Sequence, residues 1–271
     1  MTARAIHGSE ASLLPKIHYF GTVSSTFDEA WRLYAEGRLG QWDSVIARSQ
    51  TAGRGQLRRG WISPPGNLYW TVRLPCVEPF DSPGAAVALG ALIANALCDL
   101  GCEALLKWPN DIVARTEKGI AKIAGILLEE KDGCVLAGIG INIAAAPEAA
   151  ELKAEGAMPA TTLAACAPGA SLPPPSEIGR QILRHIRSAC KDGGVFASLW
   201  RDLAAARLLW TGQEVIVREG EKELRGVFLG LGKDGCALIE QDGATHEIYG
   251  GTMRAAGQAG QTEICGMARE E

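Results

Sequence analysis

Three apolar segments in the middle of the chain constrain its fold more than any other feature. They are Ala104–Trp108, Lys122–Leu128 and Cys134–Asn142, and turn-forming residues separate them. Short apolar runs joined by turns are typical of neighbouring strands in one sheet. Tyr19–Val23 and Leu68–Leu74 are two further predicted strands, the second because apolar and polar side chains alternate along it. The sequence therefore predicts one large sheet-containing domain.

Helices are predicted where capping signals flank a helical segment. One is expected over Thr26–Gly37, one between Ser82 and Gly101, and one from Ser176 onward. In the first helix, Thr26 can cap the N-terminus and Glu29 occupies the capping-box position. These helices are long enough to cover a sheet.

The pattern changes near Gln213, where short strands with closely spaced turns begin. Turns rich in Gly and Asp between such strands favour a small antiparallel barrel. We therefore predict a large domain over residues 1–212, a barrel over 213–256 and a polar tail over 257–271.

Charge and cysteine usage exclude several classes of protein. A formal net charge of −4 gives no reason to expect a nucleic-acid partner. The apolar run from Gly84 to Cys98 is too short to span a membrane, and the N-terminus resembles no signal or transit peptide. The 8 cysteines form no CxxC pair, which favours reduced thiols. We expect a cytoplasmic protein with no membrane partner.

A loop over residues 50–61, QTAGRGQLRRGW, is the first candidate site, with three glycines and three arginines. Glycines let backbone N–H groups approach an anion, and arginines supply forked donors to carboxylate or phosphate oxygens. A solvated basic turn would explain the composition equally well, because the loop fits neither the Walker nor the dinucleotide pattern.

Polar groups also occur at the ends of the predicted central strands. The motif Lys107–Asp111, KWPND, ends an apolar strand, although an ordinary polar turn is an equal alternative. Lys122 precedes an apolar strand that contains Gly125, and an inward-facing lysine there needs an anionic partner, such as a small acidic ligand. In Gly138–Asn142, GIGIN, the missing side chains leave room in a buried strand.

The order of these motifs resembles the biotin protein ligases, or biotin–[acetyl-CoA-carboxylase] ligases. The matching features are Ser25-Thr26, AGRG with RRGW and SPPGNLY, KWPND, KIAGIL with Glu129, GIGIN and the C-terminal barrel, over about residues 18–255. The resemblance implies an α+β fold, with a mixed, largely antiparallel sheet flanked by helices and an SH3-like β-barrel. It implies that biotin and ATP, with Mg²⁺, form biotinyl-5'-adenylate and pyrophosphate. Biotin then passes to one lysine of a biotin carboxyl carrier protein.

The resemblance also assigns residues to this chemistry. For biotin it assigns Ser25, Thr26, Gln50, Gly53, Arg54, Gly55, Lys122 and Gly125. For ATP it assigns Arg54, Arg59, Trp61, Lys107, Asn110, Asp111 and Asn142, with Trp61 covering the adenine. Arg54 and Lys122 are the expected catalytic cations, because a carboxylate meeting a triphosphate needs fixed positive charge. Asp111 is the candidate base for the acceptor lysine, and no residue is assigned as a metal ligand.

Two departures from the family pattern concern the biotin end. Phe27 stands where many members have asparagine, and Gln56, Leu57 and Arg58 replace part of the commonest loop pattern, GRGRxGR. We predict altered loop ordering and altered retention of the adenylate.

Several alternatives remain at this stage. Only about twenty residues precede the first motif, which predicts the ligase-only type without a DNA-binding domain. The barrel either aids ATP and acceptor binding or is only a structural cap. The carrier and the oligomeric state, including a homodimer, are open. The rivals are a lipoate or octanoate ligase or transferase, and a non-catalytic regulator that binds biotin or a nucleotide.

Overall fold

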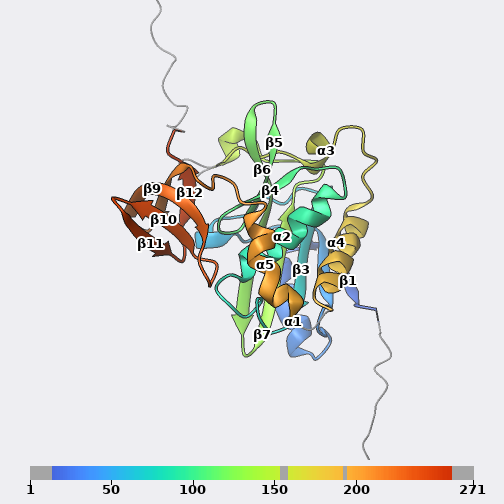
Figure 1. The fold of residues 1–271 in the computed structure, drawn as a ribbon. Coiled ribbons are helices and arrows are strands. Elements are labelled where there is room, and N and C mark those ends of the chain that lie inside the picture. The colour runs from blue at the N-terminus through green and yellow to red at the C-terminus, as the bar shows by residue number, and fades with distance from the viewer. Residues whose placement is uncertain (1–13, 153–157, 192–193, 258–271) are drawn as a thin grey trace, which may run out of the picture.

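A computed structural model of the chain describes residues 14–152, 158–191 and 194–257. Its larger sheet has seven strands in the order β1-β2-β3-β7-β6-β5-β4 (Figure 1). Their bounds are β1 Ile17–Val23, β2 Ser44–Gln50, β3 Leu68–Leu74, β4 Ala104–Lys107, β5 Asp111–Thr116, β6 Gly119–Lys131 and β7 Cys134–Ile141.

Strand directions in this sheet confirm the expected fold class. β1 and β2 run parallel, whereas every other neighbouring pair is antiparallel. The sheet is therefore mixed and largely antiparallel. The predicted strand at Lys122–Leu128 lies inside the longer β6, so Lys122 belongs to the strand rather than preceding it. β5 was not predicted, because Asn110-Asp111 was interpreted as a turn and Asp111 instead begins this strand.

Helices cover the two faces of the sheet unequally (Figure 1). α1 packs on β2, β3 and β7, whereas α2, α4 and α5 form a layer on the opposite face, with α2 innermost. The helix bounds are α1 Thr26–Ala35, α2 Ala85–Cys98, α3 Leu163–Cys166, α4 Pro175–Ala189 and α5 Val195–Ala205, with 3₁₀ turns at Gln56–Arg58 and Ala149–Glu151. The face under α1 is thus left partly uncovered by helices.

Two predicted helix caps were wrong. The cap of α1 is Ser25, whose hydroxyl accepts a hydrogen bond from the backbone N–H of Phe27 at 3.3 Å, so Thr26 is the first helical residue. α4 begins at Pro175 with Pro174 as its cap, so Ser176 lies inside the helix. Proline suits a first helical turn because its missing N–H would have no partner there.

The C-terminal strands form a second, antiparallel sheet in the order β11-β10-β9-β8-β12. Their bounds are β8 Glu214–Glu219, β9 Lys222–Leu231, β10 Ala237–Gln241, β11 Ala244–Ile248 and β12 Thr252–Ala255. This sheet is consistent with the expected SH3-like unit, although its hydrogen-bonded order ends at β11 and β12 without closing. The predicted tail lies outside the described residues from position 258 onward. None of the helices described is long and apolar enough to cross a membrane.

Candidate active site

One row of residues across the larger sheet brings three of the predicted motifs together. Lys107 pairs with Asp111, Asp111 with Gly125, Gly125 with Gly140, and Gly140 with Tyr69. Side chains in one cross-strand row point to the same face of a sheet. KWPND, KIAGIL and GIGIN therefore meet on the face that carries α1.

Charge gathers at the Lys107 end of this row. Asp111 lies 3.1 Å from the ammonium group of Lys107 and 2.5 Å from that of Lys122. Burial by itself raises the pKa of the Asp111 carboxyl, but the two ammonium groups outweigh it and hold the pKa at about 2. Two ammonium groups and one carboxylate leave one net positive charge. The cluster is therefore suited to an anionic ligand.

Gly125 and Gly140 form a floor beside this charged cluster. The indole ring of Trp61 rests on it, because a β-carbon would lie 2.5 Å from the ring at Gly140 and 2.9 Å from it at Gly125. The Lys122 ammonium lies 5.1 Å from the ring centroid. Within the described residues, the buried Nε1–H of Trp61 has no hydrogen-bond partner. The loop tryptophan thus covers the floor and one cation.

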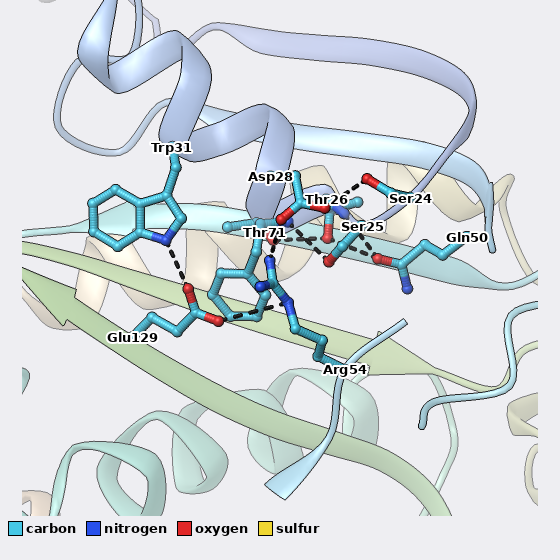
Figure 2. A network of polar contacts seen from close by, with 10 residues as sticks. Ser24, Ser25, Thr26, Asp28, Trp31, Gln50, Arg54, Thr71 and Glu129 are labelled. Atoms are coloured by element: carbon cyan, nitrogen blue, oxygen red, sulfur yellow. Dashed lines mark hydrogen bonds and ion pairs between the residues drawn. The ribbon is translucent and has the colours of Figure 1, made fainter. Parts of the chain in front are cut away.

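A neutral polar cluster lies at the start of α1 (Figure 2). The Gln50 side-chain oxygen accepts from the backbone N–H of Thr26 at 2.9 Å and from the Thr26 hydroxyl at 3.2 Å. The Gln50 amide nitrogen donates to the Ser63 hydroxyl at 3.0 Å, and the Thr71 hydroxyl donates to that of Thr26 at 2.8 Å. With the capping Ser25, these groups offer several donors and acceptors without net charge.

Ser63 and Thr71 were not predicted as site residues. Ser63 belongs to the SPPGNLY segment of the resemblance, and Thr71 is a polar residue in the alternating strand β3. Both signals were therefore present in the sequence. The side chain of Asn110 donates a hydrogen bond to the Ile126 carbonyl at 2.7 Å.

The loop over residues 50–61 folds back as a narrow hairpin. The backbone N–H of Trp61 donates to Gly53 O at 2.9 Å, and that of Gly55 donates to Arg59 O at 2.8 Å. Gly53 is needed at this crossing because a β-carbon there would lie 2.5 Å from Trp61 O. The hairpin thus connects the Arg54 backbone to the position of the Trp61 ring.

Arg54 is not beside Lys122. Its guanidinium lies 2.6 Å from Asp28 and 3.7 Å from Glu129. Glu129 stands four residues beyond Gly125 on β6, or about 13 Å at the usual rise per residue of a strand. The predicted residues therefore form two groups at the sheet, with Lys107, Asp111, Lys122 and Trp61 in one, and Arg54 near the start of α1 in the other.

Comparison with known proteins shows the family of this chain. The biotin/lipoate A/B protein ligase family matches residues 23–144. A biotin–[acetyl-CoA-carboxylase] ligase of Paracoccus denitrificans is 34% identical over 231 residues, which cover 80% of this chain and 91% of the relative. The chain belongs to the biotin/lipoate A/B protein ligase family.

Two further relatives are similar along most of the chain. The bifunctional ligase/repressor BirA of Escherichia coli K12 is 31% identical over 230 residues, or 80% of this chain and 67% of that protein. The structure of a biotin protein ligase from Aquifex aeolicus in complex with biotin and ATP superposes with a TM-score of 0.73 at 28% identity. It covers 90% of this chain and all of its own. The chain is thus similar in fold to this biotin protein ligase over most of its length.

Proposed function

We propose that this chain is an ATP-dependent biotin protein ligase. It forms biotinyl-5'-adenylate and pyrophosphate from biotin and ATP, and then transfers biotin to a specific lysine of a biotin carboxyl carrier protein. The observation that carries the proposal is the cross-strand row, where a net positive cluster adjoins a glycine floor beneath Trp61. A carboxylate approaching a triphosphate needs such fixed cations, since two anions otherwise repel each other.

The two ends of the site match the two ends of biotin. The ureido ring of biotin is neutral and both donates and accepts hydrogen bonds, which suits Ser25, Thr26 and Gln50 with the Gly53–Gly55 backbone. The valeric carboxylate of biotin suits the Lys122 ammonium, which is part of the charged cluster. Gly125 lies between these ends, and its missing side chain lets the Trp61 ring and the Lys122 ammonium group lie close to the strand. Lys122 then stabilises negative charge on the reacting carboxylate and the α-phosphate.

ATP is assigned to the other side of the charged cluster. Lys107 neutralises phosphate charge, and Arg59, Trp61, Asn110 and Asn142 border the nucleotide. Mg²⁺ would enter with ATP, because this ion usually keeps several waters and is bound by substrate phosphates together with one or two carboxylates. The described residues contain no group of three or more His, Cys, Asp or Glu side chains that could hold a metal.

Asp111 is assigned first to holding the two lysines and then to the acceptor lysine. With a pKa of about 2, its carboxylate is a weak base while both ammonium groups face it. Its basicity rises once phosphate oxygens attract Lys107 and Lys122 away. Asp111→Asn tests this second role: transfer from preformed adenylate slows if Asp111 accepts the proton, and unchanged transfer leaves it only a positional role.

Residues 213–256 are proposed as an SH3-like domain that supports the KWPND motif. The indole N–H of Trp108 donates to Gly235 O at 3.0 Å, which ties that motif to the smaller sheet. We also propose a cytoplasmic location, because the 7 cysteines of the described residues carry free thiols and a reducing compartment keeps them so.

Intact-mass spectrometry of a biotin carboxyl carrier domain tests the proposed function. Incubation with the protein, biotin and Mg-ATP is expected to add a single biotin, and Lys122→Ala is expected to slow the addition by about a hundred- to a thousandfold. Addition of lipoate or octanoate but not biotin would move the chain to the neighbouring branch of the family. No addition with any of these acids would favour a protein that only binds its ligand.

A further inference from the structure

The side chains of Phe27, Asp28, Trp31 and Glu129 lie around the guanidinium of Arg54, and we call these four residues the cage (Figure 2). One guanidinium nitrogen lies 2.6 Å from the Asp28 carboxylate, and another lies 3.7 Å from that of Glu129. Each carboxylate uses its other oxygen to accept a second hydrogen bond. Asp28 accepts from the Ser24 hydroxyl at 2.5 Å, and Glu129 accepts from the Trp31 indole N–H at 2.6 Å. Both carboxylates are therefore oriented before Arg54 reaches them.

The cage residues lie on a helix and a strand, whereas Arg54 lies in the loop. Asp28 and Trp31 lie on α1, and Glu129 lies on β6. The ring of Phe27, also on α1, is buried against Gly138 and faces the guanidinium 5.3 Å from its centroid. The cage is thus built on the scaffold and receives one side chain from the hairpin.

Holding Arg54 also holds the rest of the hairpin. The Arg54 backbone pairs with Gly60 in an isolated β-bridge, directly before Trp61. The N–H of Trp61 donates to Gly53 O, the residue before Arg54. If Arg54 leaves the cage, the strand pair that seats the Trp61 ring on Gly140 loses its anchor. The contacts of Arg54 with the cage and the contact of the Trp61 ring with Gly140 therefore hold the same loop at two points.

We propose that Asp28 and Glu129 are positioning residues that keep the loop of residues 51–61 closed over the site by holding Arg54. Two carboxylates already surround this guanidinium at the end of the site away from Lys122, so it serves as an anchor for the loop rather than as the charge that meets the substrate carboxylate. Closure matters because the acyl adenylate is an activated anhydride that water destroys. This consequence rests on the proposed function, whereas the anchoring itself does not.

The strength of the ion pairs that hold Arg54 depends on how far their side chains are exposed to solvent. The side chains of Arg54 and Asp28 are 40% and 48% exposed, so solvent screens their attraction. Partly exposed ion pairs of this kind change an equilibrium by roughly two- to fivefold each. Removing either carboxylate should therefore favour loop opening by that factor, and removing both should have a larger effect.

Asp28→Asn and Glu129→Gln test the anchor in two assays. The first is the rate of trypsin cleavage within residues 51–61 of the ligand-free protein, located by mass spectrometry. The second is the release rate of preformed biotinyl-5'-adenylate. Each variant is expected to raise both rates roughly two- to fivefold. Asp28→Glu, which keeps the charge, is expected to restore most of the protection. A purely structural role for these residues would not produce rescue that depends on charge.

Matched controls are available at the C-terminal cap of α1 and on β6. Glu36→Gln removes an exposed carboxylate near the end of α1, and Glu130→Gln removes the residue after Glu129, which points to the opposite face of the sheet. Cleavage and release rates equal to those of the controls would overturn the proposal. Because cleavage is measured without substrate, it decides the anchoring even if the chain fails to use biotin. Normal biotinylation with unchanged cleavage would refute the anchor and leave the function intact.

Discussion

The indole ring of Trp61 lies on the backbone of Gly140, so close that a β-carbon at this position would approach the ring to 2.5 Å. We expect Gly140→Ala to lift the ring from the sheet and to uncover Lys122, which lies beside it. The rate of adenylate formation should fall by about tenfold or more, because a small misplacement of positioning groups is costly in catalysis. Single-turnover adenylate formation with ATP and biotin measures the effect.

Gly21→Ala is the control for this substitution. Gly21 also lies in a strand of the same sheet, but a β-carbon there would meet no atom within 4 Å. Equal adenylation rates for the two variants would show that the seat of Trp61 on Gly140 does not matter for the reaction.

The pKa of Asp111 predicts how acid affects folding stability. Because its folded pKa of about 2 lies below the ordinary value of 3.8, the folded state gains stability from the ionised carboxylate above about pH 4. This gain is lost as the pH falls from about 4 towards 2. The unfolding free energies of the native protein and Asp111→Asn should therefore differ by a constant amount from pH 7 to pH 5.

Urea unfolding of the two proteins at pH 7, 5, 4 and 3 measures this difference. It should narrow below about pH 4, and the part that depends on pH should total about 2 kcal/mol. Other carboxylates titrate in both proteins and cancel in the comparison. A difference that stays the same down to pH 3 would contradict the depressed pKa.

Five of the seven strands of the central sheet, and the motifs at their ends, were predicted because they depend on local patterns, whereas β2 and β5 were not predicted. Leu68–Leu74 alternates in polarity and is β3 with the same bounds. α5 was missed, although its buried residues Phe196, Trp200 and Ala204 recur every four positions and provide a helical signal.

Local sequence patterns could not predict contacts between segments that are distant in the chain. That Gly125 stands opposite Gly140 depends on the register of β6 and β7, and the motifs alone suggested only that small residues make room. The family resemblance placed Arg54 near the reacting carboxylate, whereas the loop sequence by itself gives the charge of Arg54 and not its partners. Asp28 lies 26 residues earlier in the chain, and Glu129 belongs to another strand. Side-chain direction at these sites is decided by packing.

We predict that truncation of the Phe27 side chain causes a large loss of folding stability. Its ring is 3% exposed and packs on Gly138 within the smaller apolar cluster under α1. Phe27→Ala should lower the free energy of unfolding by about 3–5 kcal/mol, through lost burial and the cavity left behind. Phe27→Leu keeps most of the volume and should cost clearly less. Urea unfolding at neutral pH compares the two variants, and equal costs would argue against a role for buried volume.

Trp108 and Trp200 allow the link between the two sheets to be tested with a matched pair of substitutions. Both rings are buried, with 1% of each exposed. The indole N–H of Trp108 donates to Gly235 O at 3.0 Å, whereas that of Trp200 has no partner among the described residues. Phenylalanine removes one N–H and some ring volume at either position, but only Trp108→Phe also removes a hydrogen bond and leaves the Gly235 carbonyl without its donor.

Trp108→Phe should therefore destabilise the protein by about 1 kcal/mol more than Trp200→Phe does, because a buried carbonyl without its donor carries a desolvation cost. Urea midpoints at constant slope measure this difference. A cost for Trp108→Phe no larger than that for Trp200→Phe would mean that the hydrogen bond contributes nothing to stability. In that case other contacts would hold the smaller sheet beside KWPND, including the hydrogen bond from Arg201 on α5 to Lys233 O at 3.2 Å and the contact of the Trp200 ring with Gly84 and Gly235.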